Sequence, residues 1–308
     1  MGEYSKLVGD IGEEIVSRIL SLLGWTNHSK NNYIDCNKKA HAVKTHGIDG
    51  LFAYESPLES GTIDNVLVSS KFSASPYSRV NSTFKSHLQD LAYALECYAR
   101  SPLKKEINDG LGLSSSLRKN EVGVLFYINN DVSVEKQDII SQVKNIRINP
   151  EFKFKTIHLV DNARAAFLYN SINYVKKKYP DKSVCFFYPQ TSLNFTGLNK
   201  KYYGKILPVD YISSPIIPFF IDNGGDIQPT VCLVTSLHLT KTNVEYLVSF
   251  VRDLVSDITK DLLFLFPNYN KLLHADMISK INMGIRQREE VAIQIRVSSY
   301  SDDFRGEE

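Results

Sequence analysis

The hydrophobic positions of the chain follow a helical period in some stretches and form short β-type runs in others. In residues 10–23 the isoleucines and leucines recur three or four positions apart, the spacing of one helix face, and Gly24 supplies a stop signal. Runs rich in β-branched and aromatic residues predict strands. The predicted helices are 10–23, 84–100, 132–143, 163–177, 243–258 and 277–283, and the predicted strands are 31–36, 48–54, 66–72, 122–128, 154–160, 184–188, 230–235 and 291–297.

Strands and helices alternate along the first 190 residues. This order predicts parallel crossovers and a sheet that helices cover on both faces, which is an α/β fold. A polar loop is predicted at 110–119. Beyond residue 190 the sequence becomes richer in Gly, Pro and Tyr and closes in an acidic tail at 301–308. We therefore predict an α/β domain over residues 1–190 and a C-terminal α+β module of unknown role over residues 191–308.

Composition describes an ordinary globular protein rather than a membrane or secreted one. Of 308 residues, 43% are hydrophobic and 23% are charged, and no apolar run approaches the roughly 18 residues that span a bilayer. The four cysteines are far apart and form no Cys-x-x-Cys pair, which predicts free, buried thiols in a reducing cytoplasm and argues against a zinc site. They are Cys36, Cys97, Cys185 and Cys232.

The net charge of +2 conceals an uneven distribution along the chain. Residues 101–205 contain 17 Lys and Arg against 9 Asp and Glu, whereas residues 206–308 contain 9 against 14. A basic surface suits nucleic acid. The densest run, Lys176 to Lys178, is equally well accounted for as the cationic end of a helix.

The stretch from His46 to Phe72 concentrates the residues that suggest chemistry. Asp49 stands between glycines at the start of one predicted strand, and Lys71 lies near the end of the next. A half-buried lysine is costly unless it has a partner or a role. If the strands pair, a cation held by Asp49 would lie near the Lys71 ammonium, an arrangement that suits hydrolysis of a phosphodiester by a Mg²⁺-bound hydroxide.

Four motifs in order resemble the PD-(D/E)XK nuclease superfamily, in its restriction-endonuclease-like and RecB-like forms. Gly12-Glu13 resembles the opening helix, Gly47-Ile48-Asp49-Gly50 the acid-bearing strand, and Ser69-Ser70-Lys71 the lysine strand. Gln89-x-x-x-Tyr93 matches a motif that follows the lysine in RecB-like members, and one helical turn puts both side chains on one face. The resemblance covers residues 9–100 by motif and extends to about 190 by the order of strands and helices.

The resemblance implies a restriction-endonuclease-like core, a mixed sheet flanked by helices and extended by further β-α units. It assigns Glu13 and Asp49 to a Mg²⁺ or Mn²⁺ ion and Lys71 to catalysis. Gln89 and Tyr93, with Ser69 as a supporting residue, are assigned to DNA or to the active site. His46, beside Asp49, is a further candidate base or ligand.

Ser69 departs from the family pattern, because the superfamily has an acid two residues before the lysine. A serine hydroxyl is a poor Mg²⁺ ligand and carries no charge. Some restriction-type members recruit a carboxylate from the next helix instead. Here Glu96, on the helix face of Gln89 and Tyr93, or Asp90 could replace it, with Glu14 as a weaker candidate.

Each of these residues could equally have an ordinary structural role. Glu13 could be a solvated acid in the first turn of a helix, and Asp49 between glycines a turn residue. Lys71 could protect an edge strand from aggregation. Gln89 and Tyr93 could be a surface and a core position of an amphipathic helix.

The resulting hypothesis is a cytoplasmic Mg²⁺-dependent DNA nuclease of PD-(D/E)XK type, by analogy part of a bacterial restriction or anti-phage system. We expect an oligomer, and a second nuclease or defence subunit as a partner. The alternative is a degenerate nuclease-like subunit that binds DNA or scaffolds an active partner. A third possibility, a structural interaction protein, is favoured by the near-neutral first hundred residues, which carry 10 Lys and Arg against 11 Asp and Glu.

Overall fold

The structure is a computed structural model, which describes residues 2–26, 28–112, 118–130, 138–191, 193–194, 201–255, 258–288 and 293–300. It divides into two compact units. The first contains residues 1–166 and the short segment Pro208–Ser213, and the second contains residues 167–207 and 214–308. The division falls before the residue 190 expected from sequence, since the strand at 183–187 pairs within the second unit.

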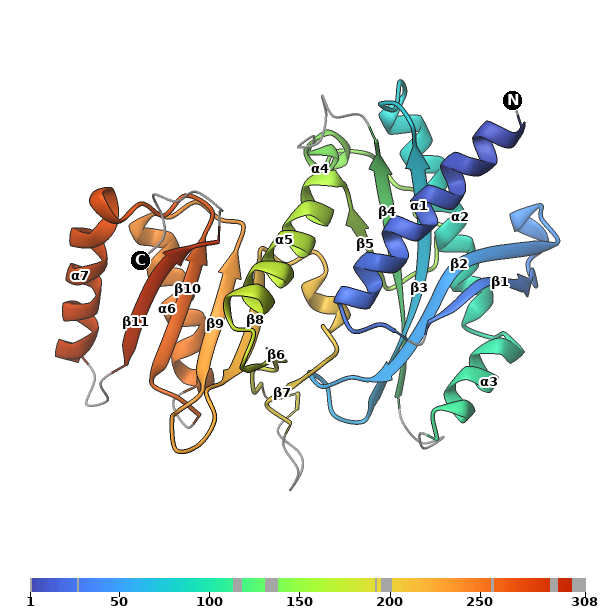
Figure 1. Cartoon of the computed structure of the whole chain (residues 1–308). Helices are drawn as coiled ribbons and strands as arrows, with labels where there is room; N and C mark the ends of the chain where they lie inside the picture. Colours follow the sequence, from blue (N-terminus) through green and yellow to red (C-terminus); the bar gives the residue numbers. More distant parts are fainter. Residues whose placement is uncertain are drawn as a thin grey trace. The chain divides into compact units, whose positions relative to one another are not determined.

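The first unit is built on a five-stranded mixed sheet in the order β1-β2-β3-β4-β5 (Figure 1). The first three strands are antiparallel neighbours, whereas β3, β4 and β5 run parallel. Its elements are α1 (Gly2–Leu22), β1 (Ser29–Asp35), the 3₁₀ turn η1 (Lys39–His41), β2 (Thr45–Glu55), β3 (Thr62–Ser73), α2 (Val80–Tyr98), α3 (Pro102–Gly110), β4 (Arg118–Asn129), α4 (Ile139–Val143) and β5 (Thr156–Val160).

Helices α1 and α2 pack on opposite faces of this sheet. Gly12 of α1 lies against Phe72 of β3, which is one face of the strand. Leu67, on the opposite face of β3, belongs to a buried cluster with the leucines of α2. The helices therefore cover both faces, as the alternation of elements predicts, and Gly24, with φ of 79°, ends α1.

The second unit contains a six-stranded sheet in the order β11-β10-β9-β8-β6-β7. Strands β9, β10 and β11 are parallel, and β8, β6 and β7 continue the sheet antiparallel. Helices α6 and α7 contribute to its main buried cluster. The remaining elements are α5 (Asn162–Lys178), β6 (Ser183–Phe187), β7 (Tyr203–Gly204), η3 (Val209–Tyr211), β8 (Ile216–Asp222), β9 (Thr230–Thr235), α6 (Lys241–Val255), β10 (Asp261–Phe266), α7 (Lys271–Arg288) and β11 (Gln294–Ser299).

Most predicted elements are present, with ends shifted by a few residues. The fold class is confirmed: mixed sheets flanked by helices, as in restriction-endonuclease-like proteins. Helix α1 begins earlier than predicted, and α3, β7, β8 and β10 were not predicted. Part of the loop at 110–119, part of the helix at 132–143 and the tail at 301–308 lie outside the described residues. Within the described part of the chain, no helix has the length and apolar character needed to cross a membrane.

Candidate active site

Asp49 of β2 is fixed against the strand that carries Lys71. Its Oδ2 accepts a hydrogen bond from the backbone N of Ser70 at 2.6 Å. The ladder between β2 and β3 ends at Gly50 and Val68, so the Asp49 carboxylate pairs with a strand N–H that the ladder no longer reaches. The acid and the lysine strand, separated by 21 residues, therefore meet at one end of the sheet.

Lys71 lies half-buried beside aromatic side chains. Its register partner in β4 is Tyr127, which is fully buried and stacks on Tyr77 with ring centroids 4.0 Å apart. No ion pair joins Lys71 to another residue within the described ranges. Ser69 lies on the same face of β3, by strand alternation. A half-buried ammonium is costly without a partner, and Lys71 has no ion pair among these residues. Its position therefore suits binding of an anionic substrate.

His87 of α2 adjoins this lysine and was not identified from the sequence. Its pKa is lowered by burial and then by the charge of Lys71, partly offset by Asp90. The ring is therefore a neutral imidazole at pH 7. Its Nδ1 is buried without a hydrogen-bond partner among the described residues. The available signal was the position of His87 and Asp90, three residues apart on the helix that follows the lysine strand.

Glu13 is exposed on α1, on the other side of the sheet from α2. The preceding Gly12 allows α1 to approach β3: a Cβ there would lie 2.8 Å from Phe72 Cγ and closer still to Phe72 Cβ. This accounts for the glycine of the Gly-Glu pair. Among the described residues Glu13 has no hydrogen bond or ion pair, and its carboxylate does not belong to a group of converging ligand atoms with Asp49.

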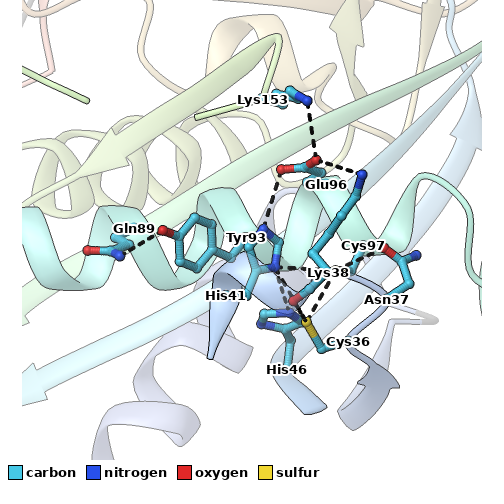
Figure 2. Close-up of polar contacts among 10 residues, drawn as sticks. All are labelled: Cys36, Asn37, Lys38, His41, His46, Gln89, Tyr93, Glu96, Cys97 and Lys153. Atoms are coloured by element: carbon cyan, nitrogen blue, oxygen red, sulfur yellow. Dashed lines mark hydrogen bonds and ion pairs between the residues drawn. The ribbon is translucent and has the colours of Figure 1, made fainter. Parts of the chain in front are cut away.

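Gln89 and Tyr93 interact as their spacing predicts. Gln89 Nε2 donates a hydrogen bond to the Tyr93 hydroxyl at 3.0 Å (Figure 2). The Tyr93 ring stacks on His41, with centroids 3.9 Å apart. The pair thus extends along α2 toward His41, and the described contacts link neither residue to Asp49.

His46 and Glu96 belong to a second group of side chains around His41. His46 Nε2 lies 3.3 Å from His41 Nδ1, and Glu96 Oε2 lies 3.4 Å from His41 Nε2 (Figure 2). Burial lowers the pKa of His46, as does the charge of His41. Burial raises the pKa of Glu96, but hydrogen bonds from Lys38 and His41 and the charge of Lys153 outweigh it and leave the pKa lowered. Glu96 is therefore ionised, and Lys38, Lys153 and the His41 ring hold its carboxylate.

A pocket with a cationic lining lies beside Glu96. Lys153 and Lys155, from the basic middle third of the chain, contribute to it. Its four basic residues face two carboxylates, so the pocket carries a net positive charge suited to phosphate. The lining comprises Lys38, Leu95, Glu96, Ala99, Arg100, Glu121, Lys153, Phe154 and Lys155.

Ligand atoms for a divalent ion are sparse around Asp49. Within the described ranges, only one group of three or more His, Cys, Asp or Glu side chains has converging ligand atoms, and Asp49 and Glu13 are not in it. Asp49 Oδ1 has no hydrogen bond to a described residue, so one carboxylate oxygen is available. A single available carboxylate oxygen is compatible with Mg²⁺, which commonly takes one or two carboxylates and completes its coordination shell with water and phosphate.

A family model described as "GAPS4 protein PD-(D/E)XK nuclease domain" matches residues 1–164, which is more than half of the chain. The match includes the Gly-Glu pair, Asp49, Lys71 and the Gln-x-x-x-Tyr motif, and it ends before the second unit. Comparison with curated proteins and with solved structures gave no significant match.

Proposed function

Because the chain belongs to the GAPS4 PD-(D/E)XK nuclease domain family, we propose that it is a metal-dependent nuclease that hydrolyses phosphodiester bonds of DNA. One observation carries the proposal: the Asp49 carboxylate is hydrogen-bonded to the strand residue that immediately precedes Lys71. An acid and an ammonium at one end of the sheet supply the opposite charges that a metal ion and a phosphate require.

In this proposal Asp49 and Glu13 hold a Mg²⁺ or Mn²⁺ ion. PD-(D/E)XK nucleases generally use divalent metals, and the bound ion supplies an activated water and neutralises charge on the phosphate. Lys71 orients the attacking water or stabilises the developing negative charge. Ser69 contributes a hydroxyl rather than a charge. We leave Glu96 out of the metal site, because Lys38, Lys153 and the His41 ring already engage its carboxylate.

DNA is the substrate that the surroundings of the site favour. Gln89 and Tyr93 lie on the helix that faces the lysine strand, and the pocket with the cationic lining offers phosphate contacts on the same unit. Binding through phosphates should be strongest at low salt and should weaken steeply as salt is added.

The decisive test combines metal titration with cleavage of linear and circular DNA. We expect the wild type to bind Mn²⁺ in calorimetry and to cut DNA only when Mg²⁺ or Mn²⁺ is present. Asp49→Ala should lose both metal binding and cutting, whereas Lys71→Ala should lose cutting and retain DNA binding. Matched controls are Asp109→Ala and Lys85→Ala, which remove exposed charges elsewhere on the first unit. Equal cutting by all variants would overturn the assignment.

A second candidate function, a nuclease-like subunit that binds DNA without cutting it, is favoured by Ser69. The superfamily acid is missing there, and the described residues offer few ligand atoms near Asp49. Ser69→Asp separates the two functions. If the chain is an active nuclease, Ser69→Asp should tighten Mn²⁺ binding and preserve or raise DNA cutting. If it is a binding subunit, the wild type should not cut DNA and should bind it equally well with or without metal. Absence of DNA binding at low salt would leave only a structural role.

The biological setting follows by analogy with the family. We propose a cytoplasmic role in bacterial anti-phage defence, with the second unit, which lies outside the family match, contacting a partner subunit or a second copy of the chain. Light scattering of the purified protein and a phage challenge of cells carrying Lys71→Ala test the two parts separately.

A further inference from the structure

Four side chains from separate elements point toward one another inside the first unit. Cys36 follows β1, His41 ends η1, His46 lies in β2 and Cys97 lies in α2 (Figure 2). One ligand atom from each, a sulfur or a ring nitrogen, lies within 4.8 Å of all the others. His41, His46 and Cys97 are buried and Cys36 is partly buried.

Four of the six distances within this group match those between ligands of one tetrahedral metal ion. Zinc takes sulfur at about 2.3 Å and nitrogen at about 2.05 Å, so a tetrahedral site spaces two sulfurs by about 3.8 Å, two nitrogens by about 3.3 Å and a mixed pair by about 3.6 Å. Cys36 and Cys97 Sγ are 3.9 Å apart, and the two histidine nitrogens are 3.3 Å apart. His41 Nδ1 lies 3.5 Å from each sulfur.

The chain between Cys36 and His46 is folded so that it brings three of these ligands together. Cys36 N donates a hydrogen bond to Lys44 O at 2.8 Å, which closes the loop at its base. Within the loop, η1 is followed by Ala42, whose φ of 54° turns the backbone into the left-handed region. A non-glycine residue rarely adopts this conformation without a reason in the surrounding structure.

Neither a disulfide bond nor hydrogen bonding alone accounts for the group as well as a metal ion does. A disulfide would bring the two sulfurs to about 2.05 Å, much closer than they lie, and both cysteines are free thiols. Hydrogen bonding gives each thiol one weak bond outside the group, from Cys36 Sγ to Lys38 O at 3.3 Å and from Cys97 Sγ to Asn37 Oδ1 at 3.6 Å. It leaves the two ring nitrogens that face the group with only these thiols and each other. Buried polar groups normally have stronger partners than these.

The surroundings also resemble the outer shell of a metal site. The ring of His41 presents Nδ1 to the group while its Nε2 lies 3.4 Å from the Glu96 carboxylate. A carboxylate on the far nitrogen fixes the tautomer and makes the ligating nitrogen more basic. Tyr93 stacks on the same ring at 3.9 Å and holds its plane.

We propose that Cys36, His41, His46 and Cys97 bind one structural Zn²⁺ ion, separate from the divalent ion proposed at Asp49. Four protein ligands close the coordination shell, which is the mark of a structural rather than a catalytic zinc site. Two thiolates and two imidazoles in tetrahedral order favour zinc over the oxygen-preferring Mg²⁺ and Mn²⁺. The ion ties the loop between β1 and β2 to α2, and its ligand His46 stands three residues before Asp49.

The proposal departs from the sequence expectation of free thiols without a zinc site; in the structure all four cysteines are free, two of them buried and two partly buried. No close pair of zinc ligands stands out in the sequence, because the set combines single residues at 36, 41 and 46 with a fourth ligand, Cys97, far downstream. Only the packing of α2 against the loop reveals the site.

The test begins with the metal content of the whole wild-type chain. Protein purified under reducing conditions from zinc-supplemented medium should contain one zinc ion per chain by elemental mass spectrometry. X-ray absorption at the zinc edge should count two sulfur and two nitrogen neighbours. Protein reconstituted with Co²⁺ should show the intense visible bands of a tetrahedral site and a thiolate charge-transfer band. None of these measurements depends on nuclease activity, so their outcome is independent of the proposed function.

Variants then assign the ligands. Cys97→Ser and His46→Ala should lose the zinc and unfold at a lower temperature. Cys232→Ser, which removes a fully buried thiol from the second unit, and Cys185→Ser should retain it. If a ligand variant fails to fold, the neighbour count on the wild type still decides. A wild type that holds no metal even after zinc is added, or zinc retained in full by folded Cys97→Ser, overturns the proposal.

Discussion

At the scale of single residues, the contact between Gly12 and Phe72 sets how closely α1 can approach the lysine strand. Gly12→Ala would place a methyl group inside the Phe72 side chain, next to a strand that cannot easily move. We expect the first unit to lose about 1–3 kcal/mol of stability, the usual range for overpacking. Trp25, the only tryptophan and fully buried in this unit, reports its unfolding in denaturant.

Gly9→Ala is the matched control for this prediction. It lies one turn earlier on α1 with open space around its missing Cβ. There alanine should stabilise the helix by about 0.5–1 kcal/mol, because it lowers the entropy lost on folding. Two alanine variants that shift the midpoint equally would show that α1 does not pack as closely as Gly12 indicates.

The coupling between Lys71 and His87 predicts a measurable change in a single pKa. Burial and the charge of Lys71 lower the pKa of His87. Lys71→Met removes the charge, so the His87 pKa should rise toward about 6.5, its ordinary value. Imidazole NMR titration measures this directly, with exposed Lys85→Met on the same helix as the control. An unchanged His87 pKa in Lys71→Met would place the ammonium away from the ring.

The sign of the effect on stability follows from linkage. In the folded state His87 binds its proton less readily than in the unfolded chain, so the unfolded state binds more protons below about pH 6.5. The first unit therefore keeps its full free energy of unfolding above that pH. It loses the part that depends on a neutral His87 as the pH falls toward the pKa of His87 in the folded state. With the lysine removed, this loss should be smaller.

At the scale of elements, patterns local in sequence were predictable and distant pairings were not. The order of Asp49 and Lys71 in the sequence was enough to predict that they lie near each other. Strands β2 and β3 are consecutive and antiparallel, so the start of β2 lies beside the end of β3. Strand β10 was missed because its continuous apolar run shows neither the period of an amphipathic helix nor the alternation of a half-buried strand. Strand β8 was missed because Pro218 argues against a strand. The proline lies before the part of β8 that pairs with β6.

Asp161 illustrates a contact between elements that no local pattern indicates. It is almost fully buried between β5 and α5, and its carboxylate accepts from Arg164 N at 2.9 Å. The other oxygen accepts from Ile139 N at 2.8 Å and Ile140 N at 3.3 Å, at the start of α4. One side chain thus caps two helices, because both present unpaired N–H groups to it.

Asp161→Ala should cost the first unit about 2–4 kcal/mol, because it removes two caps and leaves buried N–H groups unpaired. Asp161→Asn should cost less, since its amide oxygen can still accept at one helix. Asp138→Ala, an exposed N-cap of α4 that bonds only within that helix, should cost about 1 kcal/mol. Equal losses in Asp161→Ala and Asp138→Ala, measured by Trp25 fluorescence in denaturant, would contradict the double cap.

At the scale of the whole molecule, the two units are not simple halves of the sequence. The segment Pro208–Ser213 belongs to the first unit although it follows elements of the second. Arg164, mostly buried, donates to Ile212 O at 2.5 Å and to Tyr211 O at 2.7 Å. Val209 N donates to the buried hydroxyl of Tyr54 at 2.8 Å. The family match ends at residue 164 and so omits this returning segment.

A fragment of residues 1–166 should therefore be less stable than the first unit in the full chain. Without the returning segment, the Arg164 guanidinium loses both carbonyl acceptors, and hydrogen bonds to a charged group are worth about 1.5–3 kcal/mol each. A synthetic peptide of residues 206–215 should raise the unfolding midpoint of the fragment, increasingly with concentration, because it binds only the folded state. A scrambled peptide should have no effect. If the fragment alone unfolds at the same midpoint as the full chain, followed by Trp25 fluorescence, the segment contributes nothing and the first unit is complete at the end of the family match.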